Sequence, residues 1–319
     1  MKSLLTDPGC RLCPRDCGAD REHGRKGYCR VSSEILAARA ALHFWEEPCI
    51  SGTRGSGAVF FCGCSLGCIY CQNRTIARAE TGRKISVSRL AEIFLELQEQ
   101  GAHNINLVTP THYTPQIADA LQRAKKQGLR IPIVYNCGGY EGEEALRWME
   151  GLVDIYLTDF KYRDNSLAER YSGAPDYPEQ AEKALELMFR QTGKPVFDEE
   201  GMLRRGIIVR HLLLPGALKN ARAVVEYVYG TYGDDVYLSL MNQYTPLLQE
   251  DRELPAPLNR KVTKREYEKL IDFALNLGVV NAFVQEGDTA KESFIPEFAG
   301  TGLERKTADT MTEKEIRYE

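Results

Sequence analysis

Apolar and polar positions follow two alternating periods along the chain from residue 58 onward. Short apolar runs with the length of buried strands are each followed by a segment whose apolar residues repeat at helical spacing. Leu90, Ile93, Phe94 and Leu97, for example, share one helical face, and Gly101 follows as a stop signal. The runs that predict strands are AVFF (58–61), INLVT (105–109), IPIVY (131–135), DIYLTDF (154–160), GIIVRHLLL (206–214), DVYLSLM (235–241) and a candidate seventh, VVNAFVQ (279–285).

The segments between these runs predict helices over residues 85–101, 114–128, 141–151, 177–193, 217–230 and 263–278. The last begins with a capping box, Thr263 to Glu266, and ends at Gly278. Strands separated by helices of this length are typical of βαβ units in a parallel sheet. We therefore expect an α/β fold, a partial (β/α)6-type TIM barrel, with its chemistry at the carboxyl ends of the strands.

The two ends of the chain depart from this alternation. Residues 1–50 predict an irregular Cys-rich extension, which includes the short apolar stretch EILAARAALHFW. Residues 51–300 predict the partial barrel. Residues 301–319 are charged and poor in apolar side chains, so we expect a mobile tail.

Composition narrows the class of protein. The 319 residues are 43% hydrophobic and 27% charged, which is typical of a globular enzyme. The net charge of -4 provides no electrostatic footprint for nucleic acid or an anionic membrane. The first residues lack the apolar region of a signal peptide, and no apolar run is long enough to span a bilayer. We therefore expect a cytoplasmic protein without nucleic-acid or membrane partners.

Ten cysteines are unusual for a reducing compartment, where clustered cysteines more often bind metal or do redox chemistry. Cys64, Cys68 and Cys71 are spaced C-x3-C-x2-C directly after the first predicted strand. A structural zinc site usually has four protein ligands, whereas three cysteines on a [4Fe-4S] cluster leave one iron open. A zinc site or an electron-transfer cluster with Cys62 as fourth ligand are the alternatives, but we expect Cys62 to be a small buried residue.

A second group of cysteines lies near the amino terminus. Cys10, Cys13, Cys17 and Cys29 form the pattern C-x2-C-x3-C-x11-C, which suits four-thiolate coordination. The segment is too short to build its own core, so a metal would have to hold it. Zinc and an auxiliary [4Fe-4S] cluster both stay open, with a structural zinc slightly favoured.

The three-cysteine loop, with Tyr70 before its last cysteine, resembles the signature of the radical S-adenosylmethionine (SAM) superfamily. Six further segments, together with CIYCQN, resemble the PflX-type homologues of pyruvate formate-lyase activating enzyme, from about residue 10 to about residue 300. These segments are VTPTHYTPQIADA, IVYNCGGYEG, DIYLTDFKY, YSGAPDYPE, VRHLLLPG and FIPEF.

The resemblance implies that the open iron binds SAM and that the reduced cluster cleaves it to methionine and a 5′-deoxyadenosyl radical. That radical abstracts hydrogen from a substrate. The chemistry is anaerobic, and the protein would exclude oxygen and water from the site. A flavodoxin- or ferredoxin-type protein would donate the electron. The activity would be that of an oxidoreductase.

The resemblance also suggests cofactor-binding residues beyond the cysteines and Tyr70. Asp159 and Lys161 match an Asp-x-Lys that related activating enzymes place near SAM, where the lysine meets the carboxylate. Arg210 lies on an apolar strand, so it should be paired or face the lumen, where it could bind a carboxylate. Asn136 and Asn242 follow predicted strands and are candidates to contact SAM or to cap a loop.

Three functions remain open from the sequence. The first is activation of a glycyl-radical enzyme by removal of hydrogen from a glycine. The second is radical modification of a peptide or small molecule, in which case the resemblance reports ancestry and cofactor handling. The third is an Fe–S electron-transfer protein. Thr109 and Thr111 stand where relatives carry a GGE motif, which weakens transfer of contacts to the SAM amino group.

Overall fold

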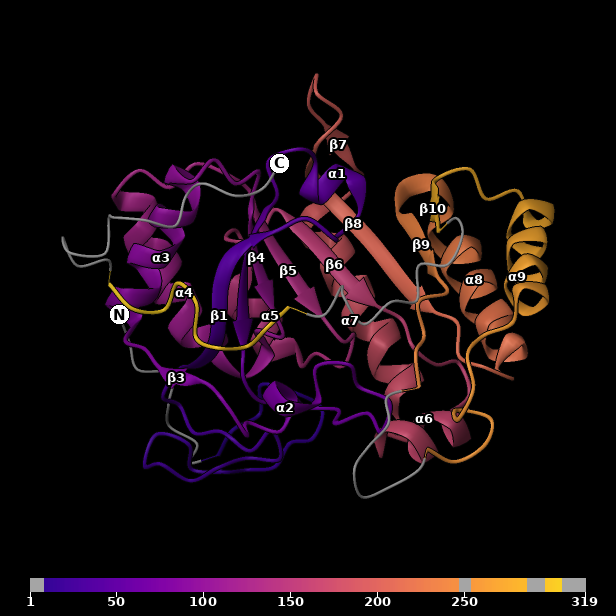
Figure 1. The fold of residues 1–319 in the computed structure, drawn as a ribbon, viewed down its shortest axis with the longest axis horizontal. Helices are drawn as coiled ribbons and strands as arrows, with labels where there is room; N and C mark the ends of the chain where they lie inside the picture. The colour runs from indigo at the N-terminus through magenta and orange to yellow at the C-terminus, as the bar shows by residue number, and fades with distance from the viewer. Residues whose placement is uncertain (1–8, 247–253, 286–295, 306–319) are drawn as a thin grey trace.

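One curved sheet organises the computed structural model, which describes residues 9–246, 254–285 and 296–305 (Figure 1). The strands lie in the order β10-β9-β8-β6-β5-β4-β2-β1-β3, and β7 pairs with β8 outside this path. The strands are β1 (Leu36–His43), β2 (Ser56–Phe61), β3 (Arg83–Lys84), β4 (Ile105–Val108), β5 (Ile133–Cys137), β6 (Ile155–Asp159), β7 (Val196–Phe197), β8 (Leu203–Leu212), β9 (Tyr237–Met241) and β10 (Ala282–Val284).

The sheet is mostly parallel and does not close. From β2 through β4, β5, β6, β8 and β9 to β10, each neighbouring pair is parallel, whereas β1 runs antiparallel to both β2 and β3. Because β10 and β3 end the path, the sheet is an open partial barrel. The predicted α/β fold is confirmed, and the candidate seventh strand is present as β10.

The six predicted helices form, and most pack along the outer face of the sheet (Figure 1). The predicted capping box is confirmed, because the Glu266 amide donates to Thr263 Oγ1 at 3.2 Å and the Thr263 amide donates to Glu266 Oε2 at 2.9 Å. The helices are α1 (Pro48–Ser51), α2 (Arg74–Ala77), α3 (Val87–Glu99), α4 (Thr114–Lys126), α5 (Glu143–Met149), α6 (Asn165–Ser172), α7 (Tyr177–Thr192), α8 (Leu218–Tyr232) and α9 (Lys264–Leu277), with 3-10 turns η1 (Thr111–Tyr113) and η2 (Gly233–Asp235).

Two predictions about the ends of the chain are wrong in part. The apolar stretch within residues 1–50 is not irregular but contains β1, whose strand pairing with β2 carries it into the sheet. Residues 301–305 are not a free tail, because Leu303 is buried and Arg305 pairs with Glu92 at 2.7 Å. The rest of the predicted tail, 306–319, lies outside the described residues.

The short helix α1 packs against the lumen of the barrel at the end opposite α2 and α6 (Figure 1). Its Cys49 and Ile50 are buried in one cluster with apolar residues of β5, β6 and β8. Those strand residues are Val134, Ile155, Leu157, Leu203 and Ile208. Strand side chains alternate between faces, so Asn136, Asp159 and Arg210, two positions after Val134, Leu157 and Ile208, also point into the lumen. No helix in the described part of the chain is long and apolar enough to cross a membrane.

Candidate functional site

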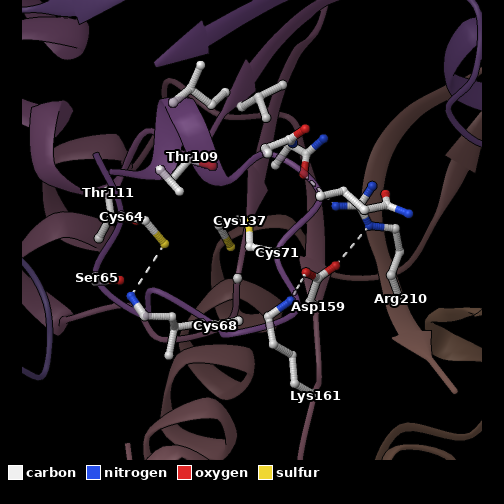
Figure 2. Close-up of a pocket in the computed structure, with 18 of the residues that line it drawn as sticks. Cys64, Ser65, Cys68, Cys71, Thr109, Thr111, Cys137, Asp159, Lys161 and Arg210 are labelled. Carbon is white, nitrogen blue, oxygen red and sulfur yellow. Dashed lines mark hydrogen bonds and ion pairs between the residues drawn. The ribbon is translucent and has the colours of Figure 1, made fainter. Parts of the chain in front are cut away.

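A cavity of about 260 Å³ opens at the carboxyl ends of the parallel strands. Side chains from six strand ends and from the loop after β2 line it (Figure 2). In Figure 2 Cys64 lies at the left and Asp159, Lys161 and Arg210 lie at the right, with Cys68 and Cys71 between them. The predicted site residues among the lining are Cys64, Cys68, Tyr70, Cys71, Asn136, Asp159, Lys161 and Arg210.

The cluster loop, residues 63–71, turns sharply as it leaves β2. Gly63 and Gly67 have φ of 95° and 68°, a conformation that favours glycine. A Cβ at Gly63 would also lie 2.8 Å from the carbonyl oxygen of Cys29, so the loop needs glycine there for space as well. The loop thus follows a path that presents its three cysteines to the cavity.

The three thiols of the loop lie near one another in a largely buried environment. Burial raises the pKa of Cys64, and it raises the pKa of Cys71 to about 12, with Cys68 next in effect on both. Ser172 Oγ lies 3.0 Å from Cys68 Sγ. A thiol with such a pKa keeps its proton at neutral pH unless a cation replaces it. The donor set fits a thiolate-bound cluster.

In the described residues, no three Cys, His, Asp or Glu side chains converge closely enough to hold a single metal ion. A cubane cluster does not need such convergence, because each cysteine binds a different iron. A zinc ion does need it, because four bonds of about 2.3 Å meet at one point.

The four cysteines near the amino terminus, which we call the knot, lie close together. A Cβ at Gly27 would be 3.2 Å from Cys17 Sγ and 3.5 Å from Cys29 Sγ. Burial raises the pKa of Cys13 to about 12, and Cys10 and Cys29 both add to that rise. The four thiols are neighbours, although no three of them converge on one point in the described structure.

A charged network crosses the cavity opposite the cluster loop. Asp159 pairs with Lys161 and accepts from Arg210 Nε at 3.0 Å. Arg210 also donates to Asn136 Oδ1 at 2.6 Å and to Glu46 Oε2 at 3.0 Å. Strand register explains the meeting, because Asp159 pairs with Arg210 across β6 and β8, and Asn136 pairs with Leu157, two positions before Asp159.

Opposite charges stabilise one another within the network. Burial alone would raise the pKa of Asp159, but Lys161 and Arg210 outweigh it and hold that pKa below its usual value. The pKa of Lys161 and that of Arg210 are both raised, although burial acts against each, because Asp159 stabilises the cations. Lys161 and Arg210 therefore face the carboxylates of Glu46 and Asp159, and the buried Glu47, whose pKa burial raises, also interacts with Arg210.

Glu46 is a site residue that the sequence did not indicate. It follows β1, in the segment predicted to be irregular, and its Oε1 accepts from Asn106 and Asn136, both at 3.1 Å. The one available signal was an acidic pair, Glu46 and Glu47, placed between the apolar stretch and a proline. Nothing in that local pattern says that it reaches strands distant in sequence.

Two predicted cofactor residues have different surroundings. Tyr70 lines the cavity, but its hydroxyl is 2.7 Å from that of Tyr162, in a buried cluster of tyrosines. Asn242 is not among the residues that line the cavity, although its neighbour Gln243 is. The Asn242 amide donates to Gln285 Oε1 at 3.0 Å.

Two residues after β4 and β5 give the cavity further chemistry. Thr109 has φ of 58°, which is strained for a β-branched residue and would suit the glycine found in the GGE motif of relatives. Glu141 is buried and lines the cavity, and burial raises its pKa to about 7. Tyr135 donates to this carboxyl at 2.8 Å.

The fold and site together define an α/β partial barrel with a thiol-lined cavity at the carboxyl ends of its strands. Residues 58–204, which contain the cluster loop, match the family model described as the Radical SAM superfamily. This chain is thus similar to that superfamily over the segment that carries the cluster loop, and a [4Fe-4S] cluster and SAM are the cofactors that the family implies. The PflX-type subfamily is not part of this result.

Other proteins are similar over longer stretches. The uncharacterized protein MJ0674 of Methanocaldococcus jannaschii is 28% identical over 272 residues, 83% of this chain and 74% of that protein. The structure of Streptococcus suis SuiB bound to S-adenosylmethionine is similar at 15% identity and a TM-score of 0.46, over 70% of this chain and 48% of SuiB. This chain thus spans about half of SuiB. Methylornithine synthase (PylB) is similar at 14% identity and a TM-score of 0.45, over 69% and 67% of the two chains.

Proposed function

We propose that this chain is a radical SAM enzyme in which Cys64, Cys68 and Cys71 hold a [4Fe-4S] cluster beside bound SAM. The observation that carries the proposal is one cavity that is lined by three thiols and by a network of opposite charges. When bound, the cluster and SAM supply a 5′-deoxyadenosyl radical. The protein's part is to bind, orient and shield them.

The charged network suggests how the two cations divide that work. Arg210 is held by Asp159, Glu46 and Asn136, so it is a fixed part of the wall. Lys161 Nζ, among the described residues, pairs with Asp159. A carboxylate that enters the cavity can replace that single contact at lower cost than it can free Arg210. We therefore assign contact with the SAM carboxylate to Lys161, and orientation of the wall to Asp159.

The test is anaerobic reconstitution with iron and sulfide, reduction, and assay of 5′-deoxyadenosine formed from SAM. Cleavage is expected for the wild type and should be lost in Cys64→Ala, Cys68→Ala and Cys71→Ala. Cys62→Ala is the matched control, because this buried thiol donates to the Thr81 carbonyl oxygen at 3.2 Å and lies outside the proposed ligand set. Cleavage that persists in all three ligand variants would refute the proposal, and an electron-transfer protein would show none.

The hydrogen donor is proposed to be a polypeptide, with a glycine of a glycyl-radical enzyme as first candidate. A second cavity, which shares Asn136 and Arg210 with the first, reaches the surface beside Trp45. Trp45 and its neighbour Phe44 are 63% and 50% exposed, and large aromatic side chains are enriched where proteins bind one another. A glycine-centred EPR signal on an added partner would support this, whereas product formation from a free small molecule alone would favour the alternative.

We also propose that the knot binds a metal through its four thiolates. Arg21 is only 6% exposed, and its guanidinium contacts the carbonyl oxygens of Val31, Ser32 and His112 and Cys10 Sγ at 3.7 Å, with no carboxylate partner among the described residues. A buried cation needs a counter-charge, and a four-thiolate metal centre is negative. Metal analysis of the wild type and Cys10→Ser should show loss of one zinc, or of one cluster's iron, in the variant.

A further inference from the structure

We propose that Arg15 is a positioning residue that fixes the shape of the cluster loop and joins it to the knot. The inference rests on the proposed function of that loop, but it concerns a residue outside the ligand set. Arg15 lies between two knot cysteines, Cys13 and Cys17, and its side chain extends to the cluster loop.

The guanidinium of Arg15 binds two chain segments at once. Nε donates to the carbonyl oxygen of Ser65 at 2.8 Å, and Nη2 reaches that of Leu66 at 3.5 Å. Nη2 also donates to the carbonyl oxygen of Ser172 at 2.9 Å, and Nη1 donates to that of Gly173. One side chain thus contacts the cluster loop and the carboxyl end of α6.

These two segments hold Cys68 between them. The Ile69 amide donates to the carbonyl oxygen of Tyr171 at 2.9 Å, and Ser172 Oγ lies 3.0 Å from Cys68 Sγ. The α6 end is therefore bound to the loop directly after Cys68 and, through Arg15, to the loop directly before it. Loss of Arg15 would free residues 65 and 66 while the contact at Ile69 stays.

Aromatic rings hold the guanidinium in the required plane. Its central carbon lies 4.0 Å from the ring centre of Tyr28 and 5.2 Å from that of Tyr140. A planar fork of five N–H donors suits several carbonyl acceptors in a fixed arrangement, whereas a lysine ammonium supplies one point charge. Charge is thus not the property that the position needs, and Arg15→Lys should not restore what Arg15→Gln removes.

The backbone at Arg15 is fixed by the knot and its neighbours. The Asp16 amide donates to the carbonyl oxygen of Cys13 at 3.1 Å, which closes a turn around Arg15. On the other side, the Gly142 amide donates to the carbonyl oxygen of Leu12 at 3.2 Å, after β5. The knot therefore gives Arg15 a defined origin from which its side chain can position the loop.

The experiment is hydrogen–deuterium exchange on the full-length protein as isolated, compared for wild type, Arg15→Gln, Arg15→Lys and the control Arg25→Gln. Arg25 is exposed and lies in the same segment, so its substitution makes the same change in charge. Exchange in peptides that cover residues 64–71 should be about tenfold faster in both Arg15 variants, as expected for lost bonds to a charged donor. Peptides from β5, β6 and β8 should not change.

A second readout uses the reconstituted protein. Release of cluster iron to a chelator should be about tenfold faster in both Arg15 variants at a temperature where circular dichroism shows an intact fold. Unchanged exchange in residues 64–71, equal acceleration across the sheet, or full rescue by Arg15→Lys would each overturn the proposal. If wild-type protein binds no cluster, the proposed function fails, yet the exchange comparison still decides the role of Arg15.

Discussion

Asp159→Asn is the substitution that most directly tests the charged network. The change keeps the shape of the side chain and an oxygen that can accept from Arg210, but it removes the negative charge shared by Lys161 and Arg210. The side chains of Asp159, Lys161 and Arg210 are 18%, 19% and 15% exposed, so water screens them only in part. In the variant, Glu46 is the remaining carboxylate that accepts a hydrogen bond from Arg210.

The expected loss is about 3 kcal/mol in the free energy of unfolding. Removal of one partner from a buried ion pair typically costs about 3–5 kcal/mol, because the other charge is left uncompensated. The lower end applies here, because Arg210 keeps Glu46 at 3.0 Å and Asn136 at 2.6 Å. With a denaturant slope of about 3 kcal/mol per molar, the urea midpoint of the metal-free protein should fall by about 1 M.

The sign of the pH dependence follows from the pKa of Asp159. Burial is the largest single influence on this pKa and would raise it. Lys161 and Arg210 together outweigh burial and hold the pKa below its usual value. A carboxyl whose pKa is lower in the folded than in the unfolded state stabilises fully above the unfolded value, about 3.9. The contribution is lost as the pH falls through the folded value. The difference between wild type and Asp159→Asn should therefore be constant above about pH 5 and shrink below about pH 4.

The assay is urea unfolding followed by circular dichroism at pH 7, 5 and 3.5. Asp119→Asn is the control, because its partner Arg123 is on the surface, at 2.8 Å in an i, i+4 pair. This control should show little change at any of the three values. A loss at pH 7 no greater than in the control, or a difference as large at pH 3.5 as at pH 7, would refute the account of the network.

Two further substitutions test neighbouring features. Gly139→Ala, at φ 79°, would place a Cβ against the Asp159 carbonyl oxygen and 2.7 Å from Tyr177 Oη. Urea unfolding should therefore show a loss of about 3 kcal/mol or more in the free energy of unfolding. The control Gly128→Ala, at φ 105° with no neighbour within 4 Å, should lose only about 1–2 kcal/mol. Glu141, whose pKa burial raises to about 7, should make wild-type stability fall as the pH rises from 5 to 8, because folding then holds a proton that the unfolded chain has released. Glu141→Gln should flatten that slope in the same unfolding assay, and an unchanged slope would contradict the assignment.

Periodicity predicted most of the barrel because each element carries its own signal. Six strands and six helices could be placed from local apolar spacing, with shifts such as that of β5, predicted at 131–135 and found at Ile133–Cys137. The convergence of Asn136, Asp159 and Arg210 could also be predicted from the sequence. Parallel strands bring their carboxyl ends to one edge, and alternation fixes which side chains face the lumen. The hydrogen-bond partners of these residues within the network could not be predicted, because they depend on the register of the strands.

What local pattern missed lies where the chain crosses between elements. The strand β1 has an alanine-rich sequence, Leu36–His43, with an arginine at its centre, and only its pairing with β2 defines it as a strand. Glu46 and Arg15 act at long range, over 164 residues to Arg210 and 158 residues to Gly173. Contacts at such separations depend on the tertiary fold of the whole chain. They leave no periodic trace in the sequence.

The residues that complete the site come from both sides of the segment that matches the superfamily. Arg15 and Glu46 precede residue 58, and Arg210 follows residue 204. The matched segment holds the cluster loop, Asp159 and Lys161. The flanking residues fix the loop and the wall around it, so differences between this chain and proteins of that superfamily are expected to lie there. MJ0674 aligns with this chain over 272 residues, which is longer than the segment that matches the family model. The residues of MJ0674 that correspond to Arg15, Glu46 and Arg210 would show whether the two proteins share one cavity.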